Sequence, residues 1–123
     1  MVNAEDLLRN LAKSEEIEIE TRHDLTSPLH RTTIWIVPTE AGVYVRSGSP
    51  EGRWYREALA NPNVTVRVGR RTVGARVQPA TGSSVIRAVN AAYREKYGER
   101  WPEAAEEVVE RSELNTTLRL IAS

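Results

Sequence analysis

Several short runs of this chain alternate apolar and polar side chains with a period of two, and turn residues separate the runs. The clearest runs occupy residues 64–68 and 73–77, and Gly69-Arg70 lies between them. A β-strand places every second side chain on the same face, so this alternation indicates strands with one buried face. Two such runs joined by a glycine-containing turn predict an antiparallel hairpin. The pattern therefore favours a fold built around an antiparallel sheet.

The same criteria predict further strands and several helices. The further strands are expected at residues 17–22, 32–37, 43–46 and 117–121. Helices are expected after a cap at Asn3, from Pro50 with Ser49 as its cap, after Ser83 or Ser84, and from Pro102. Together these elements predict an α+β, mainly β fold, a six-stranded antiparallel barrel with flanking helices. Alternation alone does not separate a barrel from a sandwich or an open α+β sheet.

Composition limits the organisation and the chemistry of the chain. Its 123 residues predict one domain over residues 1–123. The absence of cysteine excludes disulfides, thiolate catalysis and cysteine-based metal sites. No apolar run is long enough to cross a bilayer and the first residues lack a signal layout, so we expect a cytoplasmic protein without a membrane partner. The balance of 17 basic and 17 acidic residues argues against a nucleic-acid partner.

Polar and cationic side chains gather in three neighbouring stretches, at residues 30–33, 44–48 and 52–56. The residues of interest there are Arg31, Thr32, Thr33, Arg46, Ser47, Gly48 and Arg53. If the strands pair as a meander, the three arginines and the hydroxyls face one cleft. Guanidinium groups form charge-assisted hydrogen bonds with anions, and glycine lets the backbone approach closely. The set therefore predicts a site for an anionic group.

Simpler interpretations of the same residues stay open. The arginines as a whole are consistent with a compositional bias toward arginine, because only Lys13 and Lys96 are lysines. Arg46 and Arg53 are also consistent with surface cations paired with Glu51 or Glu57. Trp35 and Trp54 are more typical of core or interface positions than of stacking platforms. A single-stranded RNA contact through the arginines near residue 70 is a third and weaker hypothesis.

The segment HRTTIWIVPTEAGVYVRSGSPEGRWYREALANPNVTVRVGRRTVGARV resembles the core of the flavin- and deazaflavin-binding split-barrel proteins. These include pyridoxamine-phosphate-oxidase-like proteins and deazaflavin-dependent nitroreductases. The ending Leu59-Ala60-Asn61-Pro62 of the short helix matches their pattern. More narrowly, EIEIETR, RTTIWIV, VYVRS, GRWYREA and AAYREKYG resemble the uncharacterised DUF2255 family. The likeness covers almost the whole chain.

This resemblance implies a homodimeric split barrel that binds FMN or the deazaflavin F420 in a groove between subunits. By position, residues 31–33 would run under the ring and phosphate, and Arg46 and Ser47 would form the cofactor-facing end of the next strand. Arg53 matches a phosphate-binding cation, and Trp35 or Trp54 would flank the ring. Flavin-binding members commonly have lysine where this chain has Trp54, which leans toward deazaflavin or toward no cofactor.

The implied activity is an oxidoreductase-like hydride transfer to a small-molecule substrate, in which the cofactor supplies the chemistry. The alternative is a non-catalytic binding or interaction module that kept the barrel and lost the cofactor. No side chain is identified as the catalytic acid or base, although Tyr44 or Tyr55 could donate a proton. Two histidines without helical metal-binding spacing predict no metal site, and no serine lies in a nucleophile elbow.

Overall fold

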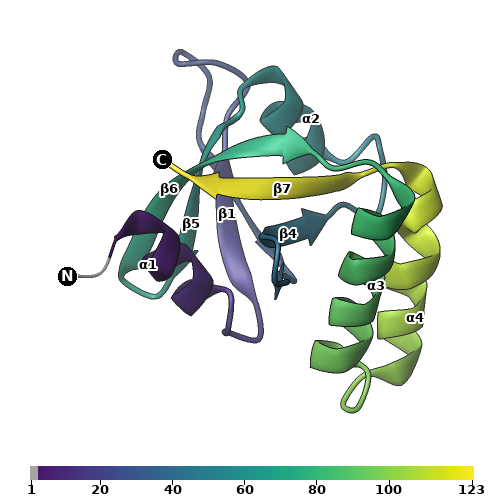
Figure 1. The fold of residues 1–123 in the computed structure, drawn as a ribbon. Helices are drawn as coiled ribbons and strands as arrows, with labels where there is room; N and C mark the ends of the chain where they lie inside the picture. The colour runs from purple at the N-terminus through teal and green to yellow at the C-terminus, as the bar shows by residue number, and fades with distance from the viewer. Residues whose placement is uncertain (1–2) are drawn as a thin grey trace.

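The computed structural model describes residues 3–123, which form a curled sheet with helices around it (Figure 1). The strands are β1 (Ile17–Thr21), β2 (His30–Ile34), β3 (Val37–Pro38), β4 (Val43–Arg46), β5 (Asn63–Val68), β6 (Arg71–Pro79) and β7 (Thr117–Ala122). The helices are α1 (Ala4–Leu11), α2 (Arg53–Ala60), α3 (Ser83–Tyr97), α4 (Pro102–Glu110) and the short 3₁₀ helix η1 (Arg111–Leu114). No helix in the described residues is long and apolar enough to span a membrane.

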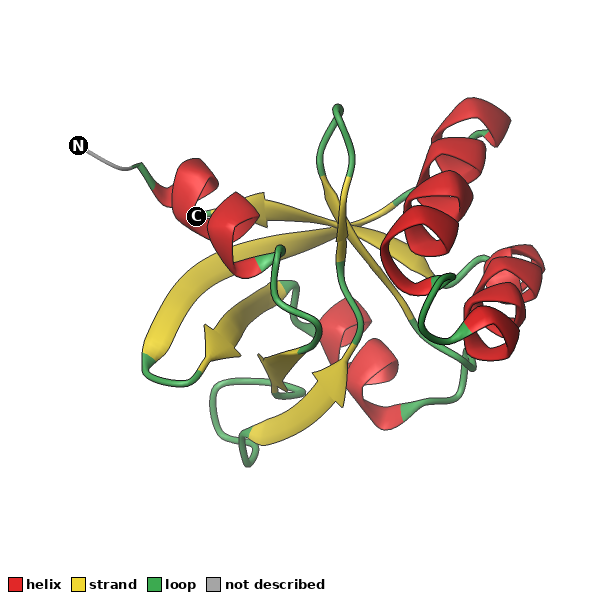
Figure 2. Ribbon diagram, turned by 90° about the horizontal axis from the view of Figure 1, so that it is seen from below, coloured by secondary structure: helices red, strands yellow, loops and turns green. Residues whose placement is uncertain are grey.

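All seven strands belong to one antiparallel sheet with the order β2-β1-β5-β6-β7-β4-β3. The sheet curls into a half-barrel, so the edge strands β2 and β3 are joined by only two residues of chain (Figure 2). This confirms the α+β class and the antiparallel barrel architecture. The predicted number of six strands is wrong, because the described residues contain seven.

The seventh strand arises because the predicted strand at residues 32–37 is broken at Trp35 and Ile36. The hydroxyl of Tyr97 accepts a hydrogen bond from the Ile36 N–H at 3.2 Å. The ammonium of Lys96 donates to the Ile36 carbonyl at 2.6 Å. Because α3 takes both backbone groups of Ile36, this residue has none left for a neighbouring strand. The chain bends there and pairs with β4 only from Val37 onward.

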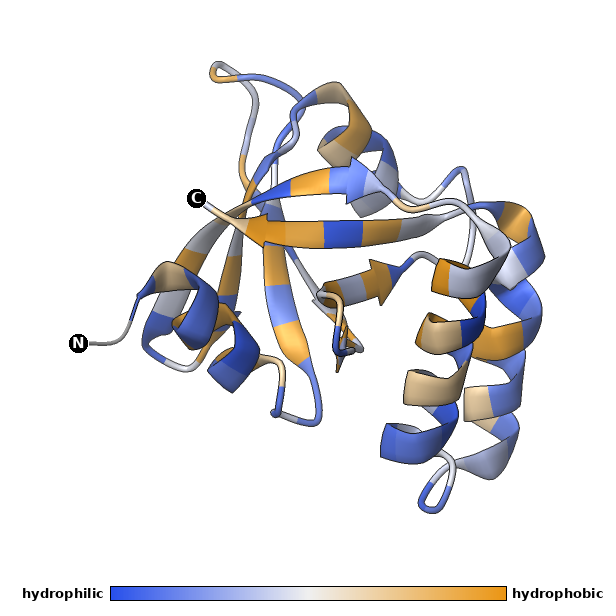
Figure 3. Cartoon of the chain, viewed as in Figure 1, coloured by the Kyte–Doolittle hydropathy of each residue, from blue (hydrophilic) through white to orange (hydrophobic). Residues whose placement is uncertain are grey.

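The barrel interior holds the larger of two apolar clusters. Alternate residues of β1, β4, β5, β6 and β7 point into it, as the banded colouring of the strands illustrates (Figure 3). Helix α1 contributes Leu8 and Leu11, and α2 contributes Trp54, Tyr55 and Ala58. Helix α2 packs against β1 and β2, so it covers one side of the barrel. Removal of this apolar surface from water is the main driving force for the fold.

A second apolar cluster joins the α3–α4 hairpin to the other side of the sheet. Val37 of β3 and Tyr44 of β4 meet Val89, Tyr93 and Tyr97 of α3 there. Tyr44 and Val45 are neighbours on β4, yet they belong to different clusters because successive side chains of a strand point to opposite faces. Strand β4 is therefore buried on both faces, between the barrel interior and the helical hairpin.

The start of α2 differs from its predicted position. The helix begins at Arg53 with Gly52 as its N-cap, three residues after Pro50. The Ser49 hydroxyl bonds to the carboxylate of Glu51 at 2.8 Å and accepts from the Glu51 N–H at 3.1 Å, so it shapes the preceding loop. Residues 47–52 consequently form the loop between β4 and α2.

Candidate functional site

Four of the residues predicted to bind a cofactor lie on one segment, the β4–α2 loop, which we define as residues 46–53. Arg46 ends β4, Ser47 and Gly48 follow, and Arg53 begins α2. The loop is folded tightly, because a Cβ added to Gly52 would lie 3.2 Å from the Ser47 hydroxyl. The Ser47 hydroxyl donates to the Ser49 carbonyl at 2.7 Å. The first turn of α2, with its unpaired N–H groups, is thereby placed beside the end of β4.

Arg46 is a buried cation that has no carboxylate partner. Only 8% of the residue is exposed, and burial lowers the pKa of Arg46 below its usual value. Its Nε donates to the hydroxyl of Thr117 at 2.8 Å, and its Nη1 donates to the side chain of Asn90 at 2.7 Å and to the Val108 carbonyl at 2.9 Å. Its Nη2 is buried without a hydrogen-bond partner. No ion pair within residues 3–123 involves this guanidinium.

Arg111, which sequence reasoning missed, lies against the same loop. A Cβ on Gly48 would lie 3.1 Å from Nη1 of Arg111, so the absence of a side chain at Gly48 permits this close approach. Arg111 and Arg53 are both exposed, and neither forms an ion pair within residues 3–123. Arg111 comes from η1, more than sixty residues further along the chain, so no local sequence signal connects it with the loop.

The predicted residues of β2 lie in a different environment. Arg31 pairs with the buried carboxylate of Glu20 on β1, and Arg67 of β5 approaches the same carboxylate at 3.4 Å. Thr33 is exposed, whereas Thr32 is half-buried and points to the opposite face of the strand. Within residues 3–123, no hydrogen bond, ion pair or pocket joins Arg31 to the arginines of the β4–α2 loop. The shared cleft for the three arginines stays a prediction.

The two tryptophans in the predicted set pack against the protein itself. The Trp35 ring lies on Tyr97 with ring centroids 3.9 Å apart and an interplanar angle of 2°. Trp54 is 8% exposed and belongs to the barrel interior, with its ring edge-on to Tyr55. One face of Trp35 and nearly all of Trp54 are therefore already covered. Rings covered in this way offer little surface on which a cofactor ring could stack.

A second polar cluster, also missed from the sequence, joins α2 to the strands β1 and β2. The carboxylate of Glu57 bonds to His30 Nδ1 through Oε2 at 2.8 Å and accepts from the Thr21 hydroxyl through Oε1 at 2.8 Å. Thr21 is completely buried and the Glu57 side chain is 12% exposed, whereas the His30 side chain is 31% exposed. Glu57 thus pairs with His30 and not with Arg46 or Arg53, which was one of the simpler interpretations.

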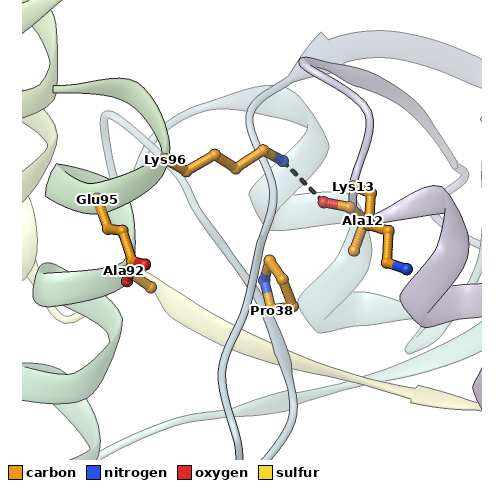
Figure 4. Close-up of a pocket in the computed structure, with 6 residues that line it drawn as sticks. All are labelled: Ala12, Lys13, Pro38, Ala92, Glu95 and Lys96. Atoms are coloured by element: carbon orange, nitrogen blue, oxygen red, sulfur yellow. Dashed lines mark hydrogen bonds between the residues drawn. The ribbon is translucent and has the colours of Figure 1, made fainter. Parts of the chain in front are cut away.

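Five pockets of the described residues lie away from the predicted set. One of about 410 Å³ lies between α1 and α3 and is lined by Ala12, Lys13, Pro38, Ala92, Glu95 and Lys96 (Figure 4). Lys96 extends across it to donate to the Ala12 carbonyl at 2.7 Å. Its ammonium also binds the carbonyls of Ser14 and Ile36, so this lysine acts as a tether between α1 and α3. None of the five pockets described within residues 3–123 includes a predicted cofactor residue.

The described residues contain no candidate metal site. No group of three or more histidine and carboxylate side chains is arranged there to hold a metal ion.

Comparison with protein families decides the classification. A family model described as an uncharacterised protein conserved in bacteria, DUF2255, matches residues 7–120. The chain belongs to the DUF2255 family. A search of curated proteins finds no match.

Solved structures share the fold of this DUF2255 protein at low sequence identity. HutZ, a haem storage protein of Vibrio cholerae, is 17% identical with a TM-score of 0.65, over 99% of this chain and 92% of that one. An FAD-binding protein of Mesorhizobium loti is 16% identical with a TM-score of 0.63, over 99% and 91%. A candidate pyridoxamine 5′-phosphate oxidase of Listeria innocua is 12% identical with a TM-score of 0.60, over 98% and 91%. These likenesses establish the split-barrel fold of the chain.

Proposed function

We propose that this DUF2255 protein binds a phosphate-bearing flavin-type cofactor, FMN or the deazaflavin F420, with the phosphate at the β4–α2 loop. The observation that carries the proposal is Arg46, a buried guanidinium with no carboxylate partner in the described residues and with one unpaired nitrogen. A buried charge is costly unless an opposite charge compensates it. The nearest partial compensation is the ring of Tyr93, whose centroid lies 5.4 Å from the guanidinium carbon, so an anion bound at the adjoining loop would stabilise Arg46 further.

The residues around the loop suit a phosphate. Arg53 and Arg111 are exposed and unpaired in residues 3–123, so their forks are free to bind phosphate oxygens. The first turn of α2 adds backbone N–H donors and the positive end of a helix dipole. Gly48 permits close approach of Arg111 to the loop. Glu51 is the one acid in the loop, and its carboxylate bonds to Ser49.

The resemblance assigns the ring system to residues 31–35, which include Arg31, Thr32 and Thr33 of β2 and Trp35 after it. Relatives of known structure include FAD-binding and haem-storage proteins, which supports a groove for a planar cofactor. In the flavin-binding split barrels that the sequence resembles, this groove lies between two subunits, so the proposal includes a homodimer. When bound, the cofactor would supply hydride transfer to a small-molecule substrate, and this chain would hold and orient it.

The test is a binding titration of purified protein with FMN and with F420, followed by quenching of cofactor fluorescence. The proposal predicts micromolar binding of at least one cofactor, and weaker binding by the double variant Arg53→Ala/Arg111→Ala. Arg70→Ala is the matched control, because Arg70 is exposed at the β5–β6 turn and away from the loop. Absence of binding to both cofactors, or equal loss in the control, would refute the proposal.

The alternative function is a non-catalytic binding module that has lost its cofactor. The packing of Trp35 on Tyr97 and of Trp54 in the core favours it, because both rings are occupied by the protein itself. This alternative predicts a colourless protein without redox activity toward nicotinamide or flavin donors. A yellow preparation with a flavin spectrum would reject it.

A further inference from the structure

We propose that His30 and Glu57 form a proton-transfer dyad, in which the Nε2 nitrogen of His30 exchanges a proton with a bound substrate. The inference rests on the proposed function, because the reaction it serves is hydride transfer from a reduced flavin-type cofactor. It adds an acid–base group where the sequence identified none.

The hydrogen bonds around Glu57 fix the state of the imidazole. Glu57 accepts the Thr21 hydroxyl through Oε1 at 2.8 Å, and its Oε2 lies 2.8 Å from His30 Nδ1. A carboxylate can only accept, so Nδ1 carries a proton and donates it. The remaining nitrogen, Nε2, is then the one that gains or loses a proton. In many acid–base sites a carboxylate orients an imidazole through one ring nitrogen and leaves the other nitrogen for the substrate.

The carboxylate of the dyad is shielded from water, whereas its imidazole is partly exposed. Thr21 is completely buried and the Glu57 side chain is only 12% exposed, so water competes little for the carboxylate. The His30 side chain is 31% exposed, which leaves part of the ring open to solvent or ligand. A clamp with a purely structural role has no need of an open ring edge. The other histidine, His23, is exposed and forms no hydrogen bond within residues 3–123.

The dyad connects the two elements that carry the proposed cofactor site. His30 is the first residue of β2 and immediately precedes Arg31. Glu57 lies one helical turn after Arg53, so both side chains project from the same face of α2. Helix α2 contacts β1 and β2, and Glu57 bonds to Thr21 and His30 across this contact, whereas Arg53 at the start of the helix is exposed. A substrate beside a cofactor held between β2 and the start of α2 is therefore within the region that the imidazole borders.

The proposed step balances in charge and atoms. When bound, a reduced flavin-type cofactor would supply a hydride, which is a proton with two electrons, to an electron-poor carbon of a C=O, C=C or C=N group of the substrate. The pair of electrons displaced from that double bond takes a proton from Nε2–H of the His30 imidazolium. This transfer would oxidise the cofactor and reduce the substrate, and solvent would return a proton to the neutral imidazole of His30, whose side chain is 31% exposed. The substrate class is thus a small conjugated carbonyl, imine or quinone.

The first arm of the test needs no cofactor. Diethyl pyrocarbonate acylates unprotonated imidazole nitrogens, and the absorbance of the product counts the modified histidines. We expect modification of both histidines in the wild type, loss of one in His30→Gln, and loss of the other in the control His23→Gln. Glu57→Gln should change the rate at His30 and leave the rate at His23 unchanged. Protection of His30 that persists at alkaline pH, where imidazoles are unprotonated and His23 is modified, would overturn the proposal, because Nε2 would be inaccessible.

The second arm separates proton transfer from electron transfer. Protein loaded with FMN is photoreduced and then reoxidised by menadione, a quinone that takes up protons, or by ferricyanide, which takes electrons alone. We expect His30→Gln to slow the menadione reaction by about 100-fold, the lower range for general acid catalysis, and to leave the ferricyanide reaction unchanged. Equal rates of menadione reduction by wild type and variant would overturn the dyad. Absence of FMN binding in the wild type would instead refute the proposed function, which the same titration shows separately.

Discussion

At the scale of single residues, the partly buried Lys96 and the buried Arg46 join distant segments, and neither forms an ion pair with a carboxylate within residues 3–123. Lys96 donates to the carbonyls of Ala12, Ser14 and Ile36 at 2.6–2.7 Å, so all three of its protons are used. Arg46 uses two nitrogens on internal acceptors and leaves Nη2 unpaired. Neutral carbonyls therefore use all three donors of Lys96, whereas one guanidinium nitrogen of Arg46 has no hydrogen-bond acceptor in the described residues.

Lys96→Met is expected to lower the free energy of unfolding by about 2 kcal/mol, because carbonyls buried between α1 and α3 lose their donor. Lys13→Met is the control, since Lys13 is exposed on the same pocket and should change stability little. Urea unfolding monitored by tryptophan fluorescence measures both variants. An equal effect of the two substitutions would contradict the tethering role of Lys96.

The same lysine gives a dependence of stability on pH. Burial lowers the pKa of Lys96 from 10.5 to about 8, and the nearby Glu15 carboxylate partly opposes this shift. Between these two pH values the unfolded chain binds more protons than the folded chain, so the contribution of Lys96 to the free energy of unfolding rises with pH. Unfolding curves of the wild type and Lys96→Met should therefore diverge in favour of the wild type from about pH 8 to 10.5. A difference that shrinks over this range would contradict the assignment.

At the scale of elements, helix α3 determines where the sheet is interrupted. Tyr97 accepts from the Ile36 N–H, donates to the Glu15 carbonyl at 2.6 Å and stacks on Trp35. Burial raises the pKa of Tyr97 to about 12, so the hydroxyl stays protonated and can donate at physiological pH. The separation of β2 from β3 is thus a consequence of contacts with a helix sixty residues away.

Tyr97→Phe is expected to cost about 1–2 kcal/mol of unfolding free energy, since it leaves the buried Ile36 N–H unpaired while keeping the ring. Hydrogen exchange of the Ile36 amide should become much faster, and the amides of the β5–β6 hairpin should keep their protection. Unchanged exchange at Ile36 would mean that the hydroxyl does not hold the bend.

The sequence predicts the elements that have local signals, and it does not predict contacts between residues far apart in the chain. Strand β4 was predicted at its observed bounds, and the β5–β6 hairpin was also predicted, because alternation and turn residues are local signals. The bend at Ile36, the His30–Glu57 bond and the approach of Arg111 to Gly48 join segments far apart in the chain. No local spacing encodes these contacts. For the same reason the ion pair of Arg31 with Glu20 has no local signal in the sequence.

At the scale of the whole molecule, the half-barrel buries its interior but leaves apolar side chains on its outside. Leu25, Leu29, Leu59, Leu114 and Ile121 are each at least 40% exposed. Exposed apolar residues are common on monomers, so their presence permits a second subunit without requiring one. The flavin-type groove of the proposed function nevertheless needs two chains.

Light scattering coupled to size exclusion is therefore expected to give twice the chain mass of 13.8 kDa. The dimer should persist on dilution to the concentrations used for cofactor titration. A monomer at high protein concentration would count against a groove formed by two subunits, although it would leave the β4–α2 loop as a phosphate site.

The central claim, a phosphate held by the β4–α2 loop, is tested most directly by comparing FMN with riboflavin, which lacks only the phosphate. Titration calorimetry is expected to show tighter binding of FMN by at least about tenfold, equivalent to about 1.4 kcal/mol. This difference should disappear in Arg53→Ala/Arg111→Ala and persist in Arg70→Ala. Equal affinities of the wild type for FMN and riboflavin, or no binding of either, would contradict the account.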